Sequence, residues 1–291
     1  MQKQLNLFGV ASCWGAQDTR CSLAPDHLKS MNLERCLSNG QVDTRWQKII
    51  RPTVNSDGTA LNAVTQVCQE LASDVGHSVR NQQPFVVFGG DHSTAIGTWS
   101  GVAKALGKTQ SLGLIWIDAH MDSHLPETSP SGALHGMPLA CLLGHGESVL
   151  THMASQGAAL LPKNVCLIGI RSFESGEAAL LQLLGVRIFY MDEVRSKGLT
   201  AVMQQAINHV TKTTDKVGIT IDLDAIDPND APGVGSPAAD GIGGQALLQA
   251  LTLMKHHPKL VGVEIAELNP ELDQNNKTAE LAIKLVESLF L

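Results

Sequence analysis

The sequence contains no run of apolar residues that approaches the roughly 18 needed to span a bilayer. Its first residues, MQKQLNLFGVASCWG, have an apolar core too short for a secretory signal. The six cysteines are scattered, without the close pairs of a zinc knuckle or of a small secreted disulfide framework. We therefore expect a soluble, cytoplasmic protein with reduced thiols.

Positive charge is also scarce, with 21 Lys and Arg against 28 Asp and Glu and a formal net charge of -7. Nucleic acids and anionic membranes favour surfaces with clustered Lys and Arg. We therefore expect no nucleic-acid partner and no membrane partner. A neutral or cationic small substrate suits this charge better.

The chain has no internal repeat, no low-complexity tract and no linker that would divide it. Its 291 residues, 43% of them hydrophobic, suffice for one large α/β domain with a well-covered core. We expect residues 1–291 to form that single domain.

Short apolar, β-branched runs alternate with amphipathic stretches, a pattern typical of a mostly parallel sheet with helices on both faces. The candidate strands are residues 5–10, 85–88, 112–117, 164–168, 186–190, 217–221 and 260–265. The clearest candidate helices, with apolar residues three or four apart, are residues 59–79, 199–211, 244–255 and 278–290.

Polar motifs follow four of these apolar runs. Residues 85–88 lead into GGDHS, residues 112–117 into DAHMDSH, residues 217–221 into DLDAIDP and residues 260–265 into AELNP. In parallel sheets, ligands bind beyond the carboxyl ends of the strands. The motifs are therefore expected to share one crevice.

The motifs contain residues of the kind that bind metals. Asp118, His120 and Asp122 lie two positions apart, so an extended backbone would send all three side chains to one side. Asp222 and Asp224 repeat the spacing, and His92 follows a Gly-Gly turn. A lone histidine in such a turn can equally be structural, and DLDAIDP alone could be a capped turn.

Together these residues supply four carboxylates and two imidazoles. Such a cluster would repel itself and be costly to bury unless cations neutralised it. Six ligands suit two metal ions, and oxygen-rich coordination without thiolate favours manganese-like ions. Two close cations can lower the pKa of a water held between them and make it a nucleophile.

The motifs at residues 89–93, 118–122 and 222–228 give the chain a strong resemblance to the ureohydrolase (arginase and agmatinase) family, most of all to arginases. The likeness runs from residue 85 to the carboxyl terminus and is loose near the amino terminus. It implies a three-layer α/β/α sandwich around a mostly parallel sheet of about eight strands. It also implies a homo-oligomer, a trimer or hexamer.

The same resemblance implies two Mn²⁺ per subunit, although ligand type does not separate manganese from Co²⁺, Ni²⁺ or Fe²⁺. One ion would bind His92, Asp118, Asp122 and Asp222. The other would bind His120, Asp118, Asp222 and Asp224.

The implied reaction is hydrolysis of the guanidinium group of L-arginine to urea and L-ornithine by a metal-bridging hydroxide. His135 matches the family's proton-shuttling histidine, Glu267 matches the carboxylate that binds the guanidinium, and Asp122 takes part in catalysis. A plainer interpretation of His135 is a histidine in a turn, and a plainer interpretation of Glu267 is a solvated acid in a loop.

The resemblance also assigns residues to the amino-acid end of the substrate. Ser129, Ser131 and His124 would bind the α-carboxylate, Glu174 and Glu177 would bind the α-ammonium group, and Ser236 would contact substrate. Arginases usually have asparagine at the positions of His124 and Ala133. Glu174 and Glu177 could instead be acids that stabilise the first turn of a helix.

Other functions fit the same motifs. A sister amidinohydrolase would act on agmatine, guanidinobutyrate or a formimino amino acid such as formiminoglutamate. A non-catalytic relative would bind guanidines without turnover, but such relatives tend to lose the metal ligands first. A metallophosphoesterase would need more cationic residues around a phosphate than these motifs supply.

Overall fold

A single twisted sheet forms the centre of the protein. The computed structural model describes residues 3–38, 42–53, 58–154 and 157–291. Within them, eight parallel strands pair in the order β2-β1-β3-β8-β7-β4-β5-β6. The strands are β1 (Lys3–Val10), β2 (Val42–Ile50), β3 (Phe85–Phe88), β4 (Leu112–Ile117), β5 (Val165–Ile170), β6 (Arg187–Tyr190), β7 (Lys216–Asp222) and β8 (Leu260–Ala266).

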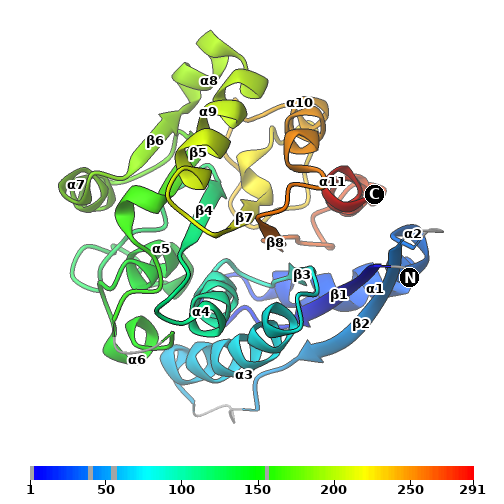
Figure 1. Cartoon of the computed structure of the whole chain (residues 1–291), viewed down its shortest axis with the longest axis horizontal. Coiled ribbons are helices and arrows are strands. Elements are labelled where there is room, and N and C mark those ends of the chain that lie inside the picture. The colour runs from blue at the N-terminus through cyan, green and yellow to red at the C-terminus, as the bar shows by residue number, and fades with distance from the viewer. Residues whose placement is uncertain (1–2, 39–41, 54–57, 155–156) are drawn as a thin grey trace.

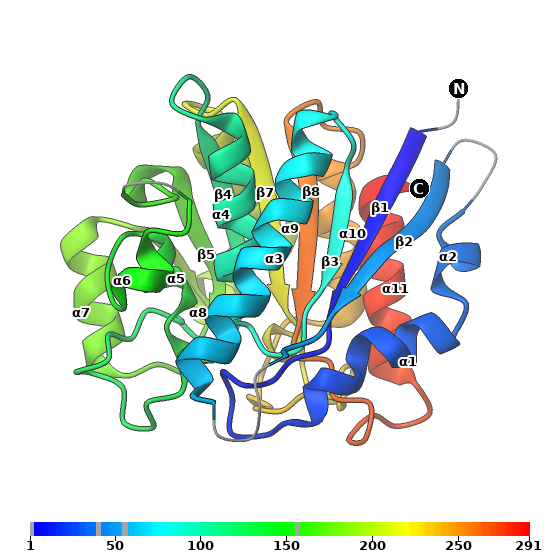
Figure 2. The ribbon, with the colours of Figure 1, turned by 90° about the horizontal axis from the view of Figure 1, so that it is seen from below.

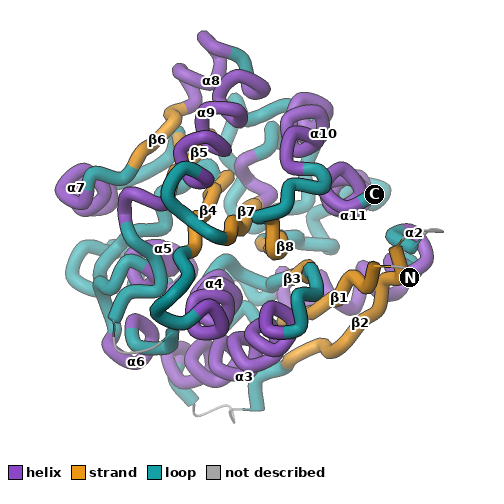
Figure 3. The backbone as a smooth tube through the Cα atoms, viewed as in Figure 1, coloured by secondary structure: helices purple, strands orange, loops and turns teal. Residues whose placement is uncertain are grey.

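Helices cover both faces of this sheet, so the predicted three-layer sandwich is confirmed (Figures 1 and 3). One face packs against α3 (Ala60–Arg80), α4 (Thr94–Leu106), α5 (Pro138–Leu142), α6 (Ser148–Thr151) and α7 (Ser175–Leu184). The other face packs against α1 (Ala24–Ser30), α2 (Leu33–Cys36), α8 (Met191–Lys197), α9 (Leu199–Thr211), α10 (Gly244–Leu251) and α11 (Lys277–Phe290).

All seven predicted strands are present, with boundaries that differ by at most two residues. The eighth strand, β2, was not predicted because Arg45, Gln47 and Lys48 interrupt its apolar pattern. These three side chains are exposed because β2 lies at the edge of the sheet. An edge strand with one solvated side does not show the continuous apolar run of a buried parallel strand.

The four predicted helices correspond to α3, α9, α10 and α11. The helix predicted over residues 244–255 ends earlier, since a 3-10 turn, η5 (Thr252–Met254), follows α10. The pattern did not single out α4, whose first turns are buried on every side. Gly97 lets α4 approach α3 closely, because a Cβ there would lie 2.8 Å from the Cα of Cys68.

The order of the strands places the motifs side by side. The four strands that precede them, β3, β8, β7 and β4, are consecutive neighbours in the middle of the sheet. Their carboxyl ends reach the same edge, at the bottom of Figure 2. Strands far apart in sequence thus deliver their polar ends to one place.

No helix among the described residues is both long and apolar enough to cross a membrane.

Candidate functional site

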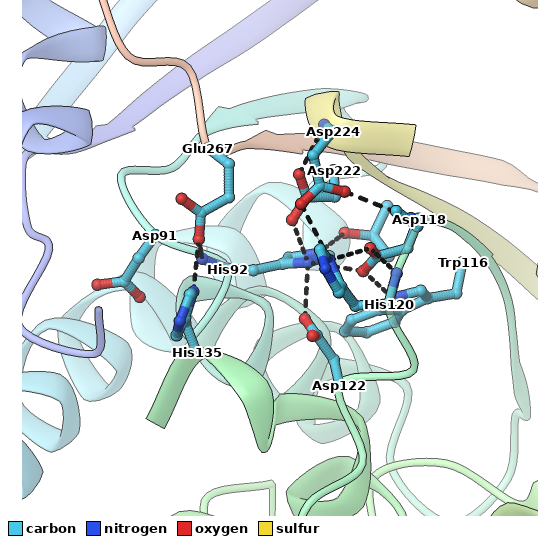
Figure 4. Close-up of polar contacts among 12 residues, drawn as sticks. Asp91, His92, Trp116, Asp118, His120, Asp122, His135, Asp222, Asp224 and Glu267 are labelled. Carbon is cyan, nitrogen blue, oxygen red and sulfur yellow. Dashed lines mark hydrogen bonds and ion pairs between the residues drawn. The ribbon is translucent and has the colours of Figure 1, made fainter. Parts of the chain in front are cut away.

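Four predicted ligands converge at the centre of the sheet's carboxyl edge. His92 Nδ1 lies 3.3 Å from Asp118 Oδ2, 3.0 Å from Asp122 Oδ2 and 3.2 Å from Asp222 Oδ2 (Figure 4). All four residues are buried. Their ligand atoms lie within 4.8 Å of one another, which is the spacing a single metal ion would need.

A second ligand group lies beside the first. His120 Nδ1 is 3.0 Å from Asp224 Oδ2 and 3.6 Å from Asp118 Oδ1. Asp118 belongs to both groups, one oxygen facing each. The structure therefore brings all six predicted ligands together in two groups, with Asp118 between them. The predicted second bridge, through Asp222, stays a prediction.

The ligand side chains after β4 converge as predicted, but the prediction of an extended backbone there is wrong. Residues 118–122 are not an extended strand: β4 ends at Ile117, bends follow, and Asp122 has φ of +49°. Glu267 has φ of +67°. Left-handed backbone at a residue other than glycine costs of the order of 1 kcal/mol or more and persists only where surroundings impose it.

Backbone hydrogen bonds impose these two conformations. The Asp122 carbonyl accepts the Leu139 amide at 2.9 Å, and the Glu267 amide donates to the Gly90 carbonyl at 2.8 Å. Gly90 itself must lack a side chain, because a Cβ there would lie 1.8 Å from the Ser12 carbonyl oxygen. The turn at Gly90 therefore fixes both His92 and Glu267.

The charges of the site are unbalanced without cations. Burial, with the neighbouring charges of Asp224 and Asp118, raises the pKa of Asp222 well above its ordinary value. Burial and the charge of Asp118 raise the pKa of Asp122 to about 6. His92 Nδ1 and Asp122 Oδ2 are buried with no hydrogen-bond partner. These orphaned atoms fit metal ligation, so the residues support a binuclear metal site.

A hydrogen-bonded chain behind His92 was missed by the sequence analysis. His92 Nε2 lies 3.1 Å from Thr220 Oγ1, and Thr220 Oγ1 donates to Glu264 Oε2 at 3.1 Å. Because the hydroxyl hydrogen points to Glu264, Thr220 can only accept from His92. The proton of His92 is therefore held on Nε2, which leaves Nδ1 free to bind a metal. The sequence signal that could have indicated this hydrogen-bonded chain is Glu264, an acid within the apolar run of β8.

We expect Thr220→Val to weaken metal binding about 10- to 100-fold, the usual effect of removing a partner of a metal-bound histidine. Thr220→Ser keeps the hydroxyl and should retain wild-type affinity. Titration calorimetry with Mn²⁺ on metal-free protein measures both variants. Equal affinities for the Val and Ser variants would show that the hydroxyl does not orient His92.

Asp118 is also held by a residue that the sequence analysis missed. Trp116 Nε1 donates to Asp118 Oδ2 at 2.8 Å, and the His120 amide donates to Asp118 Oδ1 at 2.7 Å. The Trp116 ring also stacks on His92 with 4.5 Å between ring centroids. The end of β4 therefore orients the shared carboxylate before any metal binds.

The two residues predicted to act on the guanidinium form a pair next to the first ligand group. His135 Nδ1 lies 3.0 Å from Glu267 Oε1, which also accepts the His92 amide at 3.0 Å (Figure 4). Burial alone would lower the pKa of His135, but Glu267 raises it to about 10. At neutral pH this pair is an imidazolium and a carboxylate. Cys21, missed by the sequence analysis, lies with Sγ 3.4 Å from Glu267 Oε2.

Only some of the residues assigned to the substrate's amino-acid end lie in contact with one another. His124 contacts Glu174 and Glu177, at 3.0 and 3.4 Å. Ser129 and Ser131 lie on the exposed loop after His124 and are hydrogen-bonded within that loop. No contact joins these serines to the two glutamates among the described residues.

Ser236 lies on a different loop. It lines an open pocket of about 700 Å³ together with His120, Arg171 and Ser172. Arg171, which no motif indicated, donates to the carbonyls of Asp224 and Ala238, both at 2.8 Å. It thus ties the loop of the second ligand group to the Ser236 loop.

The six cysteines are free, as predicted.

Comparison with known proteins identifies the family of the chain. A model of the Arginase family matches residues 3–291. The arginase of Brevibacillus brevis is 40% identical over 296 residues, covering 100% of this chain and 98% of that protein. The arginase of Bacillus caldovelox is 42% identical over 230 residues, covering 79% of this chain and 76% of that protein.

The crystal structure of arginase from Bacillus subtilis superposes with a TM-score of 0.91 at 34% identity, covering 99% of this chain and 98% of that one. The family match spans the described sheet and every ligand of both groups. The chain therefore belongs to the arginase family.

Proposed function

We propose that the protein hydrolyses the guanidinium group of L-arginine to urea and L-ornithine. The observation that carries the proposal is the His135–Glu267 pair beside two metal-ligand groups in a chain of the arginase family. Relatives that match the full length of the chain are named arginases, which favours arginine over agmatine, guanidinobutyrate or a formimino amino acid.

Glu267 is the residue we assign to the guanidinium. A guanidinium presents a planar set of N–H donors, which one carboxylate can accept as two parallel hydrogen bonds. Burial by itself would raise the pKa of Glu267, but His135 lowers it below its ordinary value. The group is therefore ionised at neutral pH and suited to a cationic substrate.

His135 is the residue we assign to proton delivery. The departing ornithine amine must gain a proton, and His135 carries one at neutral pH because its pKa is about 10. Its side chain is 28% exposed, so it can exchange protons with solvent between turnovers.

The six ligands would hold two metal ions, which we propose to be Mn²⁺ because the donors are carboxylates and imidazoles without thiolate. Bound metal ions would lower the pKa of water and so supply a nucleophile at neutral pH. Asp122, with a raised pKa and an unpartnered oxygen, would bind one of these ions and orient the nucleophile.

We further propose that residues 1–291 fold as one domain, supported by the single sheet with helices on both faces. A trimeric or hexameric assembly and a cytoplasmic location stay predictions.

Manganese-loaded protein should release urea from L-arginine, and chelation with EDTA should abolish that release. A colorimetric urea assay makes the measurement for L-arginine, agmatine and 4-guanidinobutyrate, and formiminoglutamate is tested by the release of formamide. Urea from agmatine but not from L-arginine would contradict the proposed substrate. Turnover that survives complete metal removal would contradict the role of the metals.

A further inference from the structure

The three side chains His124, Glu174 and Glu177 form a bonded cluster at the amino terminus of α7. His124 Nε2 lies 3.0 Å from Glu174 Oε2 and 3.4 Å from Glu177 Oε2. The His124 side chain is 7% exposed, whereas the Glu174 side chain is 59% exposed. The imidazole of His124 is therefore buried within the cluster, whereas the carboxylate of Glu174 is accessible from solvent.

Both ring nitrogens of His124 are already hydrogen-bonded. Nε2 faces Glu174, and Nδ1 lies 3.1 Å from Thr128 Oγ1. If the ring is neutral, Nε2–H donates to Glu174 and Nδ1 accepts the Thr128 hydroxyl. If the ring is protonated, Nδ1–H donates to Thr128 Oγ1, whose hydroxyl can turn to the Leu125 carbonyl at 3.3 Å. In neither state does His124 keep an unused donor for a carboxylate.

Donors for a carboxylate exist elsewhere in this region. Ser129 Oγ accepts the Gly132 amide at 3.0 Å, and Ser131 Oγ accepts the Ala133 amide at 3.2 Å. Both hydroxyls act as acceptors in these bonds, so each keeps its O–H as an unused donor. A substrate carboxylate can therefore be bound by two hydroxyls without any imidazole.

Glu177 has a different position from Glu174. It is buried, and its carboxylate accepts the Glu174 amide at 3.0 Å and the Ser123 amide at 3.3 Å. The first of these bonds stabilises the start of α7, and the second joins α7 to the backbone beside Asp122. Glu177 therefore fixes the backbone from which Glu174 projects.

The loop that carries the serines packs against this same helix start. Gly176, in the first turn of α7, has no room for a Cβ, which would lie 2.7 Å from Thr128 Cβ. Since Thr128 also faces His124 Nδ1, the imidazole joins the loop to α7 through its two nitrogens.

We propose that His124 positions Glu174 to receive the α-ammonium group of the substrate and does not bind the α-carboxylate. The inference rests on the proposed function, because it concerns the part of arginine that lies away from the guanidinium. It makes His124 a positioning residue and Glu174 the contact that selects substrates with an amine at that end.

Three guanidines separate the two roles of His124. L-Arginine has both tail groups, agmatine keeps the amine and lacks the carboxylate, and 5-guanidinopentanoate keeps the carboxylate and lacks the amine. We expect His124→Ala to lower kcat/KM for L-arginine and agmatine by at least about tenfold, the effect of one hydrogen bond to a charged group. The change should lie mainly in KM, and 5-guanidinopentanoate should be unaffected.

Two further variants sharpen the comparison. His124→Gln places an amide donor near the position of Nε2 and should restore most of the loss. In a Glu174→Gln background, His124→Ala should add no further loss, because the two residues act as one unit. Metal content, measured by mass spectrometry, should match wild type in every variant.

The same comparison can be made without turnover by measuring competitive inhibition. L-Ornithine has the α-ammonium group, whereas 5-aminopentanoate lacks it. His124→Ala should weaken inhibition by L-ornithine about tenfold and leave 5-aminopentanoate unchanged.

A lower kcat/KM of His124→Ala for L-arginine and 5-guanidinopentanoate, with an unchanged kcat/KM for agmatine, would overturn the inference, because His124 would then bind the carboxylate. An equal loss for all three guanidines would also overturn it. Failure of the proposed function looks different: metal-loaded wild-type protein would release no urea from L-arginine at all.

Discussion

Glu267→Gln should reduce urea release from L-arginine at least about 30-fold, because loss of one partner of a buried charge pair costs roughly 2–5 kcal/mol and each 1.4 kcal/mol is tenfold. The variant keeps the shape of the side chain and its bond to the His92 amide but removes the charge that would pair with the guanidinium. Steady-state assays of urea release measure the loss.

Two observations separate this explanation from damage to the metal site. Glu267 belongs to neither ligand group, so metal content should remain that of wild type. The pKa of His135, about 10 beside the carboxylate, should fall once that charge is gone, since burial alone lowers it. Titration of His135 by NMR in metal-free protein tests this. The exposed Glu271→Gln is a matched control. Metal loss in the Glu267 variant would mean that its role has been misassigned.

Asp118→Asn should abolish activity by removing the ligand that the two groups share. Asp118 directs Oδ2 to the His92 group and Oδ1 to the His120 group, so one substitution weakens both metal positions. His120→Asn should affect only the second position, because His120 belongs to that group alone.

Metal analysis of the purified variants makes this comparison. Asp118→Asn should retain at most a small fraction of the metal, whereas His120→Asn should retain close to one ion per chain. Asp227→Asn, in the same motif as Asp222 and outside both ligand groups, is the control and should keep full metal content. Equal metal content in the Asp118 variant and wild type would rule out the shared-ligand arrangement.

Much of the fold could be predicted from the sequence because buried parallel strands are continuous apolar runs. The seven interior or apolar strands were found in this way, and β2 was not, since Arg45, Gln47 and Lys48 within it are exposed to solvent. α4 lacked an amphipathic pattern for the opposite reason, as its first turns are buried on all sides.

The ligand residues could be predicted because each motif follows a strand, and the carboxyl ends of parallel strands share an edge. The geometry of the ligands could not be predicted, because it depends on left-handed backbone at Asp122 and Glu267. Neither residue is a glycine, so the sequence does not indicate that conformation there. The supporting residues Thr220 and Cys21 belong to no motif that the sequence shows. Only contacts between distant segments identify them.

The roles at the far end of the substrate site depend on hydrogen bonds rather than on residue type. His124 at an asparagine position suggested a carboxylate ligand, yet its two nitrogens face Glu174 and Thr128. Residue type alone does not reveal whether a donor is already used.

The most direct test of the account is titration of metal-free protein with Mn²⁺, followed at each step by metal analysis and by urea release from L-arginine. We predict saturation at two ions per chain, with urea release appearing as the sites fill. Saturation at a single ion, or full activity in protein without bound metal, would contradict a binuclear centre built from these six ligands.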